Sequence, residues 1–298
     1  MRVFLTGATG FIGSKVLAEL IAAGHQVIGV VRSETGADAV RAAGGEPYQG
    51  TLEAPEALAE GATQADAVVH TAFDHDFTKF VANCEKDTRV IEAIGGVLAG
   101  SNRPFLITSG VGMGNGPNGE AATEQVFDRQ NPNPRRMSEL AGEAIGAKGV
   151  SVSFVRLPQV HDTQKQGLIS PMIEIARQRG FAAYVGEGAG RWSAVHVRDA
   201  ARLYRLALEQ HENGARYHAV AESGLPARLI AEAIGKGLGI PVRSLALDEI
   251  EGYYGHFAHF ATMHLPATSD WTRQTLGWAP TGPGLIEDLQ NMDFGNAR

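Results

Sequence analysis

The amino-acid sequence predicts an α/β protein with a doubly wound parallel sheet and a smaller α-rich C-terminal lobe. Three observations support this prediction. Short β-branched runs alternate with amphipathic helical stretches through the first half of the chain. Three glycines, three residues apart, separate the first predicted strand from the first predicted helix. From Leu225 onward helical stretches continue, but strands become few. Such strand–helix alternation is typical of a parallel sheet covered on both faces.

The strands are predicted from short apolar runs, and the helices from apolar residues at helical spacing. The first helix carries Ile12, Val16 and Leu20 on one face and ends near Gly24, a residue that favours helix termination. Further helices are predicted around residues 90–98 and 140–147. Right-handed crossovers then connect the parallel strands. These strands are expected at residues 3–5, 27–31, 67–70, 104–107 and 151–157.

The second half of the chain contributes to both parts of the molecule. Residues 158–190 look rich in loops, and a strand at 194–197 and a helix at 199–210 follow them. We therefore assign residues 1–160 and 194–221 to the sheet domain. Residues 161–193 and 222–298 are assigned to the smaller lobe, which we expect to cover a substrate.

Composition excludes several classes of function. The 33 acidic residues exceed the 26 Lys and Arg, giving a formal charge of −7, so we expect no nucleic acid and no membrane surface as partner. The single cysteine, Cys84, cannot form an intrachain disulfide or a multi-thiolate metal site. The N-terminus lacks the apolar segment of a signal peptide. We therefore expect a cytoplasmic protein. The sequence is compatible with a homodimer and does not decide the oligomeric state.

The three glycines indicate a dinucleotide site. Gly7, Gly10 and Gly13 lie in the run Gly-Ala-Thr-Gly-Phe-Ile-Gly. A Cβ there would obstruct the tight turn, the approach of a pyrophosphate or the contact between helix and strand. The pyrophosphate would lie against free N–H groups at the helix N-terminus. We therefore expect a Rossmann-type domain, in which Thr9, Phe11 and Ile12 also contact the cofactor; the alternative is a tight turn without a ligand.

The end of the second strand indicates which cofactor is bound. Arg32 and Ser33 follow this strand, and Arg32 stands 19 residues after Gly13, where NAD sites usually place an acidic residue. A guanidinium suits the oxygens of a 2′-phosphate, and Ser33 can add a hydrogen bond. The sequence therefore favours NADP; the alternative is that Arg32 is a solvated surface residue.

With these features in view, the sequence resembles the extended or atypical short-chain dehydrogenases/reductases, a group that includes the NAD-dependent epimerases/dehydratases. The resemblance spans nearly the whole chain. It rests on residues 6–13 (TGATGFIG), 65–72 (ADAVVHTA), 156–160 (RLPQV), 195–201 (VHVRDAA) and 276–280 (LGWAP). It implies further cofactor contacts after the third, fourth and sixth strands, namely Thr51, Leu52, Thr71, Ala72, Phe73, Pro158 and Val160.

The catalytic residues of that group are missing. Its members use a Tyr-x-x-x-Lys pair, in which the tyrosine passes a proton to the substrate oxygen. In the best register Arg135 replaces the tyrosine and Glu139 replaces the lysine. Gly110 occupies the position of the catalytic serine or threonine, and Ser109 precedes it by one residue. Ser109 could still bind a substrate oxygen, although a hydroxyl at a strand end commonly satisfies the backbone.

Two histidine-containing segments could replace the tyrosine. His161 follows the loop that the resemblance places over the nicotinamide, and a histidine can act as a proton donor. The alternative is a loop histidine bonded to the backbone. Asp74-His75-Asp76 follows the fourth strand, at the sheet edge where such folds bind ligands. Here the alternative is that these residues cap the next helix.

The C-terminal histidines are the remaining candidate site. His256 and His259 would share a face of a helix, and His264 lies beyond them. No carboxylate or cysteine completes a familiar ligand spacing, and their neighbours are aromatic, so we expect no metal. An NADP(H)-dependent oxidoreductase acting on a small carbonyl or hydroxy compound fits the sequence best. The alternative is a non-catalytic NADP(H)-responsive binding protein.

Overall fold

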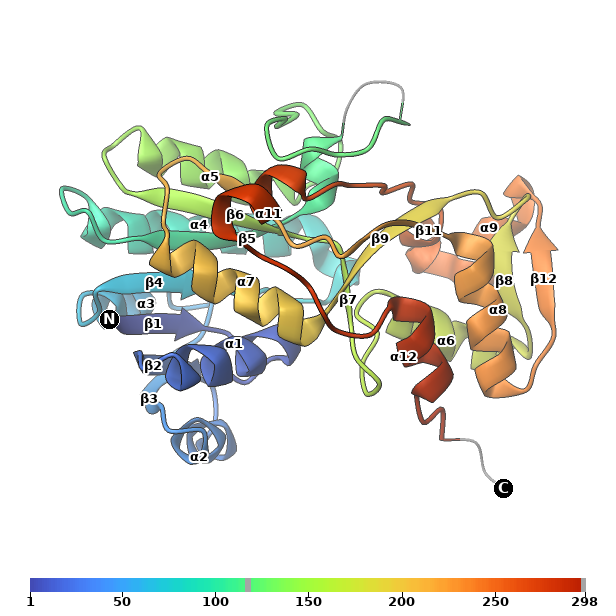
Figure 1. Cartoon of the computed structure of the whole chain (residues 1–298), viewed down its shortest axis with the longest axis horizontal. Helices are drawn as coiled ribbons and strands as arrows, with labels where there is room; N and C mark the ends of the chain where they lie inside the picture. Colours follow the sequence, from blue (N-terminus) through green and yellow to red (C-terminus); the bar gives the residue numbers. More distant parts are fainter. Residues whose placement is uncertain (116–118, 296–298) are drawn as a thin grey trace.

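The computed structural model describes residues 1–115 and 119–295, and its centre is a seven-stranded parallel sheet (Figure 1). The strand order is β10-β6-β5-β4-β1-β2-β3. The order reverses between β1 and β4, which defines a doubly wound sheet and confirms the predicted fold class. The strands are β1 (Arg2–Thr6), β2 (Gln26–Val31), β3 (Glu46–Gln49), β4 (Ala67–His70), β5 (Phe105–Gly110), β6 (Val152–Leu157) and β10 (Arg216–His218).

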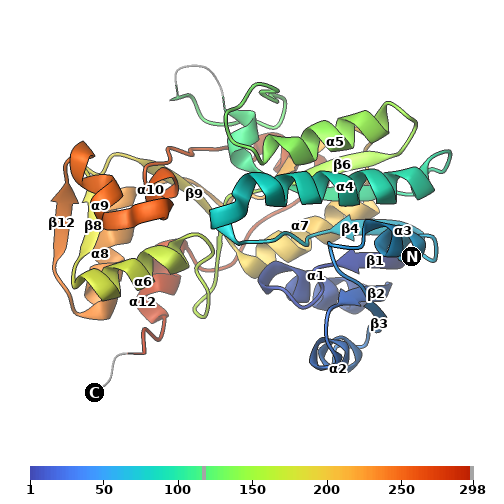
Figure 2. The same cartoon turned by 180° about the vertical axis from the view of Figure 1, so that it is seen from behind.

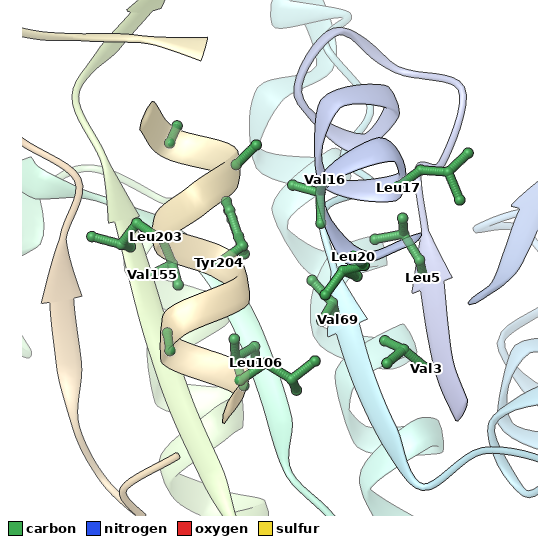
Figure 3. Packing of buried hydrophobic residues seen from close by; sticks show 14 of the residues in the cluster. Val3, Leu5, Val16, Leu17, Leu20, Val69, Leu106, Val155, Leu203 and Tyr204 are labelled. Atoms are coloured by element: carbon green, nitrogen blue, oxygen red, sulfur yellow. The ribbon is translucent and has the colours of Figure 1, made fainter. Parts of the chain in front are cut away.

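One face of the sheet is covered by α1 (Phe11–Ala22), α2 (Glu34–Ala42) and α7 (Val197–Glu209). Alternate residues of the central strands point to this face, and they pack against apolar residues of α1 and α7 (Figure 3). The buried residues labelled in that view are Val3, Leu5, Val16, Leu17, Leu20, Val69, Leu106, Val155, Leu203 and Tyr204.

The opposite face is covered by α3 (Pro55–Ala62), α4 (Phe80–Leu98) and α5 (Arg136–Gly146) (Figure 2). Phe4, Val68 and Phe105 point to this face from β1, β4 and β5. Because both faces are buried, the central strands contain continuous apolar runs rather than alternating apolar and polar residues. This is why the short apolar runs in the sequence predict these strands correctly.

The second part of the molecule lies beyond the carboxyl ends of the strands (Figure 1). A three-stranded sheet of β7 (Gln159–His161), β9 (Arg191–His196) and β11 (Glu222–Pro226) joins it to the first part. A two-stranded parallel sheet, β8 (Ala182–Val185) with β12 (Val242–Leu245), lies at its far side. Its helices are α6 (Ile169–Arg179), α8 (Ala227–Leu238), α9 (Ile250–Tyr254), α10 (Ala258–Ala261) and α12 (Leu285–Asn291).

The structure differs from the sequence-based prediction in two places. Residues 158–190 are not mainly loop, because β7, α6 and β8 lie there. The helix has a usable signal: Ile169, Met172, Ile173 and Ala176 are buried at helical spacing, and Gly180 ends it with a positive φ.

The other difference concerns the assignment of the C-terminal residues. Helix α11 (Asp270–Leu276) and Trp278 fall in the range assigned to the lobe, yet they pack with the core that contains α1 and α7. The chain therefore returns to the sheet domain before it ends in α12.

Short 3₁₀ helices complete the described elements: Phe77–Lys79 (η1), Val111–Gly114 (η2), Leu247–Glu249 (η4) and Gly255–Phe257 (η5). Among the residues placed in the structure, no helix combines the length and the apolar character that crossing a bilayer requires.

Candidate functional site

The glycine turn between β1 and α1 is built for close backbone approach. Gly7 has φ +73°, and a Cβ there would lie 2.8 Å from the Ala72 nitrogen. A Cβ on Gly13 would lie 2.0 Å from the Gly7 carbonyl oxygen, so a side chain cannot fit between helix and turn. Gly10 precedes α1 and no side chain caps that helix, which leaves the backbone N–H groups of its first turn available to an anion.

A cavity of about 1050 Å³ extends from this turn along the carboxyl edge of the sheet to the lobe. It is lined by loops that follow β1, β2, β3, β4, β5 and β6. Of the residues that the sequence singled out, the cavity is lined by Gly7, Thr9, Gly10, Phe11, Ile12, Gly13, Arg32, Thr51, Leu52, Thr71, Ala72, Phe73, Ser109, Pro158 and Val160.

Two hydroxyl groups fix the turn beside the loop after β4. The Thr71 hydroxyl donates to the Thr6 carbonyl oxygen at 2.7 Å, and the Ala72 N–H donates to the Thr6 hydroxyl at 3.2 Å. These bonds hold the backbone of residues 71–73 next to the glycine turn. The side of the cavity at the glycine turn is therefore shaped by neighbouring strand ends.

Arg32 and Ser33 have different roles in the structure. Arg32 is exposed and lines the cavity, with no hydrogen bond or ion pair to any residue that the structure describes. The Ser33 hydroxyl instead accepts a hydrogen bond from the Gly36 N–H at 3.2 Å and so caps α2. Ser33 does not line the cavity. Of this pair, the guanidinium is the group placed to meet a ligand there.

Arg135 immediately precedes α5 in the chain. Its side chain lines the cavity close to the end of β5. Its Nη1 atom donates to the Asp87 carboxylate at 2.6 Å and also to the Ser138 hydroxyl, and its Nη2 atom donates to the Thr108 carbonyl oxygen at 2.9 Å. The guanidinium carbon lies 4.1 Å from the centre of the Phe73 ring, a cation–π contact. These partners fix the orientation of the charge.

Asp87, on α4, is the buried anchor of this arrangement. Its carboxylate also accepts from the Ser138 hydroxyl at 2.6 Å and pairs with His70 Nε2 at 3.0 Å. Burial alone would raise the pKa of Asp87, but the Arg135 charge and the hydrogen bonds from His70 and Ser138 together hold it well below its usual range. Because the carboxylate can only accept, His70 Nε2 carries a proton, while His70 Nδ1 lies 2.7 Å from the Thr6 hydroxyl oxygen.

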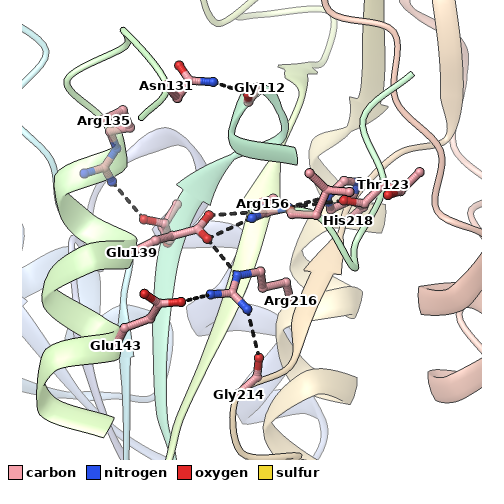
Figure 4. Close-up of polar contacts among 12 residues, drawn as sticks. Gly112, Thr123, Asn131, Arg135, Glu139, Glu143, Arg156, Gly214, Arg216 and His218 are labelled. Carbon is pink, nitrogen blue, oxygen red and sulfur yellow. Dashed lines mark hydrogen bonds and ion pairs between the residues drawn. The ribbon is translucent and has the colours of Figure 1, made fainter. Parts of the chain in front are cut away.

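Glu139, the residue in the lysine position, does not line the cavity, and its carboxylate faces Arg156 and Arg216 (Figure 4). It is fully buried, and both oxygens pair with the Arg156 guanidinium, at 2.7 and 2.8 Å. Arg216 donates to it as well, at 2.9 Å. Burial would raise the pKa of Glu139, but the Arg156 guanidinium and the other donors around the carboxylate, Arg216 among them, together lower it. Glu139 therefore stabilises the interior between α5, β6 and β10, and does not contact a ligand in the cavity.

Ser109 and His161, the candidate catalytic residues from the sequence, lie in different surroundings. Ser109 is buried but lines the cavity. His161 is fully buried and does not line it, because its ring turns toward α12. There His161 Nδ1 lies 2.6 Å from the Asp288 carboxylate, and burial lowers the pKa of the imidazole. The structure therefore does not bring His161 to the reacting end of the cavity.

Asp74, His75 and Asp76, which follow β4, all line the cavity, and the two carboxylates have partners within the protein. Asp76 accepts from the Thr78 N–H at 3.1 Å and caps η1, while Asp74 pairs with Lys86 at 2.9 Å. His75 lines the cavity and remains partly accessible to solvent. Loss of hydration around the imidazole, followed by the positive charge of Arg135, lowers the pKa of His75.

The C-terminal histidines sit on the lobe surface. His256 in η5 and His259 in α10 are exposed, while Phe257 and Phe260 beside them are buried in the lobe core. No group of three or more metal-ligating side chains is found among residues 1–115 and 119–295. Phe257 therefore serves packing, while Phe260 packs in the lobe core and also lines the cavity.

The sequence analysis missed His70 and Asp87. For Asp87 a signal exists: it stands three residues after Cys84 and three before Val90, and so falls on the buried face of its helix. His70 ends an otherwise apolar strand. Neither signal identifies the partner, because Asp87 and Arg135 are joined only by the fold.

Comparisons with known proteins agree with this architecture. The family model described as "NAD dependent epimerase/dehydratase family" matches residues 3–221. An uncharacterized protein of Schizosaccharomyces pombe is 46% identical over 97% of this chain and 98% of its own length. An uncharacterized protein of Saccharomyces cerevisiae is 40% identical, and the match covers 97% of this chain and 98% of that protein.

Solved structures share the fold. The dTDP-glucose 4,6-dehydratase of Streptomyces venezuelae, crystallised with NAD bound, superposes with a TM-score of 0.77. It is 20% identical, and the match covers 98% of this chain and 96% of that chain. The family model spans residues 3–221, a range that holds the glycine turn, and this chain belongs to the NAD-dependent epimerase/dehydratase family.

Proposed function

We propose that the protein is an NADP(H)-dependent oxidoreductase that reduces a carbonyl compound, with Arg135 in the place of the usual catalytic tyrosine. The observation that carries this proposal is the continuous cavity, which joins the glycine turn to the Arg135 guanidinium. Such a cavity can hold a cofactor and a small substrate in contact with each other.

The residues at the glycine turn fit a dinucleotide. Added Cβ atoms at Gly7 and Gly13 would collide with the backbone, and the N-terminus of α1 offers uncapped N–H groups. The exposed Arg32 supports NADP over NAD, because a guanidinium suits a 2′-phosphate. When bound, the reduced nicotinamide would supply a hydride to the carbonyl carbon.

Arg135 cannot act as an ordinary general acid, because a guanidinium stays protonated in proteins. It can instead stabilise negative charge that develops on the carbonyl oxygen. Three protein acceptors hold it in place, so little reorganisation is needed as that charge forms. The carbonyl oxygen takes up the π electron pair beside Arg135, and a water molecule from solvent provides the proton that completes the alcohol and leaves as hydroxide.

The experiment combines a binding titration with a turnover assay. NADPH is first titrated into the protein, and its oxidation is then followed by absorbance with a panel of aldehydes, ketones and quinones. With any compound of the panel that the protein reduces, we expect Arg135→Met to lower kcat about 100- to 1000-fold. Arg135→Lys should keep part of the rate. NADPH affinity should stay within about threefold in both variants.

Saturable NADPH binding without oxidation across the panel would contradict the reductase proposal. It would favour a non-catalytic protein that responds to the NADPH/NADP ratio. Failure of NADPH to bind would contradict both proposals. For location we propose the cytoplasm, where the one buried cysteine, Cys84, needs no oxidising environment.

A further inference from the structure

Four phenylalanines form one side of the cavity beyond Arg135, and we call them the aromatic wall: Phe73, Phe77, Phe80 and Phe260. Phe77 and Phe260 have ring centres 4.7 Å apart, although one follows β4 and the other belongs to the lobe. Phe80 contacts both Phe73, at 6.1 Å, and Phe260, at 5.9 Å. The wall therefore bridges the two parts of the molecule.

The wall begins at the reacting group. The Phe73 ring lies under the Arg135 guanidinium, with 4.1 Å between the guanidinium carbon and the ring centre. Phe73, Phe77 and Phe80 are only partly buried, so ring surface remains open to the cavity. Met263, Leu265 and Trp192 extend this apolar lining on the lobe side. A molecule whose oxygen meets Arg135 would thus place its body against ring faces.

Several polar groups on the lobe side of the cavity already have partners within the protein. The Ser193 hydroxyl lies 2.8 Å from both the Ser223 and Leu265 carbonyl oxygens, and the Ser170 hydroxyl accepts from the Gln166 N–H at 2.9 Å. Glu174 pairs with Arg177 at 2.7 Å. Among the described residues 161–295, the charged residues that line the cavity are Glu174 and Lys165. The Lys165 ammonium lies over the Phe11 ring beside the glycine turn.

A nucleotide sugar would bury hydroxyl and phosphate groups against this lining without enough partners, and each unpaired buried group costs free energy. An apolar ring system gains free energy from the same surface, both by burial and by ring contacts. The lining therefore favours an apolar ring system over a nucleotide sugar.

We propose that the substrate is an apolar aromatic carbonyl compound, whose ring lies against the aromatic wall and whose oxygen meets Arg135. This inference rests on the proposed reductase function and narrows it to one substrate class. The reaction balances as before: the carbonyl carbon gains a hydride, its oxygen gains a proton from water, and NADPH leaves as NADP⁺.

The first test measures binding, so that it does not depend on turnover. Calorimetric titrations of the protein, with and without saturating NADP⁺, compare 2-acetylnaphthalene with UDP-glucose. We expect saturable binding of 2-acetylnaphthalene and none of UDP-glucose. Binding of UDP-glucose alone, or of neither compound, would overturn the inference.

The second test uses variants of Phe77, which is partly buried and sits at the start of η1. We expect Phe77→Ser to weaken binding of 2-acetylnaphthalene about 10-fold, because ring contacts and apolar area are lost. Phe77→Leu should recover most of the affinity, and Val81→Ser, at an exposed position of α4, should leave it unchanged. Equal affinities in all three variants would contradict the proposed role of the wall.

These results separate the inference from the proposed function. If the protein oxidises NADPH with a polar carbonyl compound but does not bind 2-acetylnaphthalene, the substrate class is wrong and the reductase function stands. If 2-acetylnaphthalene binds the wall but no carbonyl compound is reduced, the reductase function is wrong and the apolar binding site stands.

Discussion

The Arg135 guanidinium donates a hydrogen bond to the Asp87 carboxylate across 2.6 Å, although 48 residues separate them in the chain. The bond joins the start of α5 to the middle of α4 at the edge of the cavity. The Asp87 side chain is fully buried, and the Arg135 side chain is 13% exposed. Because this pair lies out of water, its two charges depend on each other.

We expect Asp87→Asn to lower the free energy of unfolding by about 3–5 kcal/mol, because it leaves Arg135 without its buried counter-charge. Urea unfolding followed by circular dichroism measures this loss. Asp38→Asn is the matched control, because Asp38 forms an exposed ion pair with Arg41 and should cost at most about 1 kcal/mol. Equal losses in the two variants would show that the buried pair contributes little.

The cofactor preference depends on Arg32. We expect Arg32→Ala to weaken NADPH binding about 10- to 100-fold, because a charge-assisted hydrogen bond to the 2′-phosphate is lost. NADH affinity should not change. Arg41→Ala serves as control, since Arg41 lies on α2 and pairs with Glu34 and Asp38 instead of lining the cavity. If the wild-type protein binds NADPH and NADH equally well, Arg32 has no such role.

The glycine turn allows stability and cofactor binding to be separated. A Cβ on Gly10 would have one neighbour within 4 Å, the Gly7 carbonyl oxygen at 3.1 Å, and the Gly10 backbone has negative φ. We expect Gly10→Ala to cost less than about 1 kcal/mol of stability but to weaken NADPH binding at least about 10-fold, because the Cβ blocks the diphosphate.

Gly13→Ala should behave differently. Its Cβ would lie 2.0 Å from the Gly7 oxygen, so we expect a loss of about 1–3 kcal/mol or more in the free energy of unfolding. Unfolding curves and NADPH titrations of the two variants check this contrast. Unchanged NADPH affinity in Gly10→Ala would argue against a diphosphate at this turn.

Acid should destabilise the protein through His218. Burial, followed by the charge of Arg156, lowers the pKa of His218 to about 3. In the unfolded chain a histidine titrates near pH 6.5, so between about pH 6.5 and 3 the unfolded state binds more protons. The free energy of unfolding must therefore fall as pH decreases through this range.

Below pH 6, His218 should lower the free energy of unfolding by up to about 1.4 kcal/mol for each unit by which the pH falls. Unfolding measured between pH 7 and 5 should show a shallower pH dependence in His218→Asn, which keeps a donor for the Thr268 carbonyl oxygen. The carboxylates contribute equally to both proteins. An unchanged slope would mean that His218 is not held neutral in the folded state.

Much of the fold could be predicted because its signals are local. Buried central strands such as β1 and β4 are continuous apolar runs, and α1 has a clear apolar face. The edge strands lack this signal: β3 reads Glu-Pro-Tyr-Gln, because a half-exposed edge strand needs no apolar run. The buried apolar residues of helix α6 have helical spacing, but the turn-rich sequence on either side of them hid this pattern.

The sequence by itself determined the glycine turn, the doubly wound sheet and the absence of the tyrosine–lysine pair, since each depends on residue types at fixed spacing. Tertiary structure alone decided that Arg135 pairs with Asp87, that Glu139 and His161 turn into the interior, and that Phe77 meets Phe260. These relationships join residues far apart in the chain. Their partners are set by how helices and lobe pack on the sheet, and a spacing rule along the sequence contains no information about that packing.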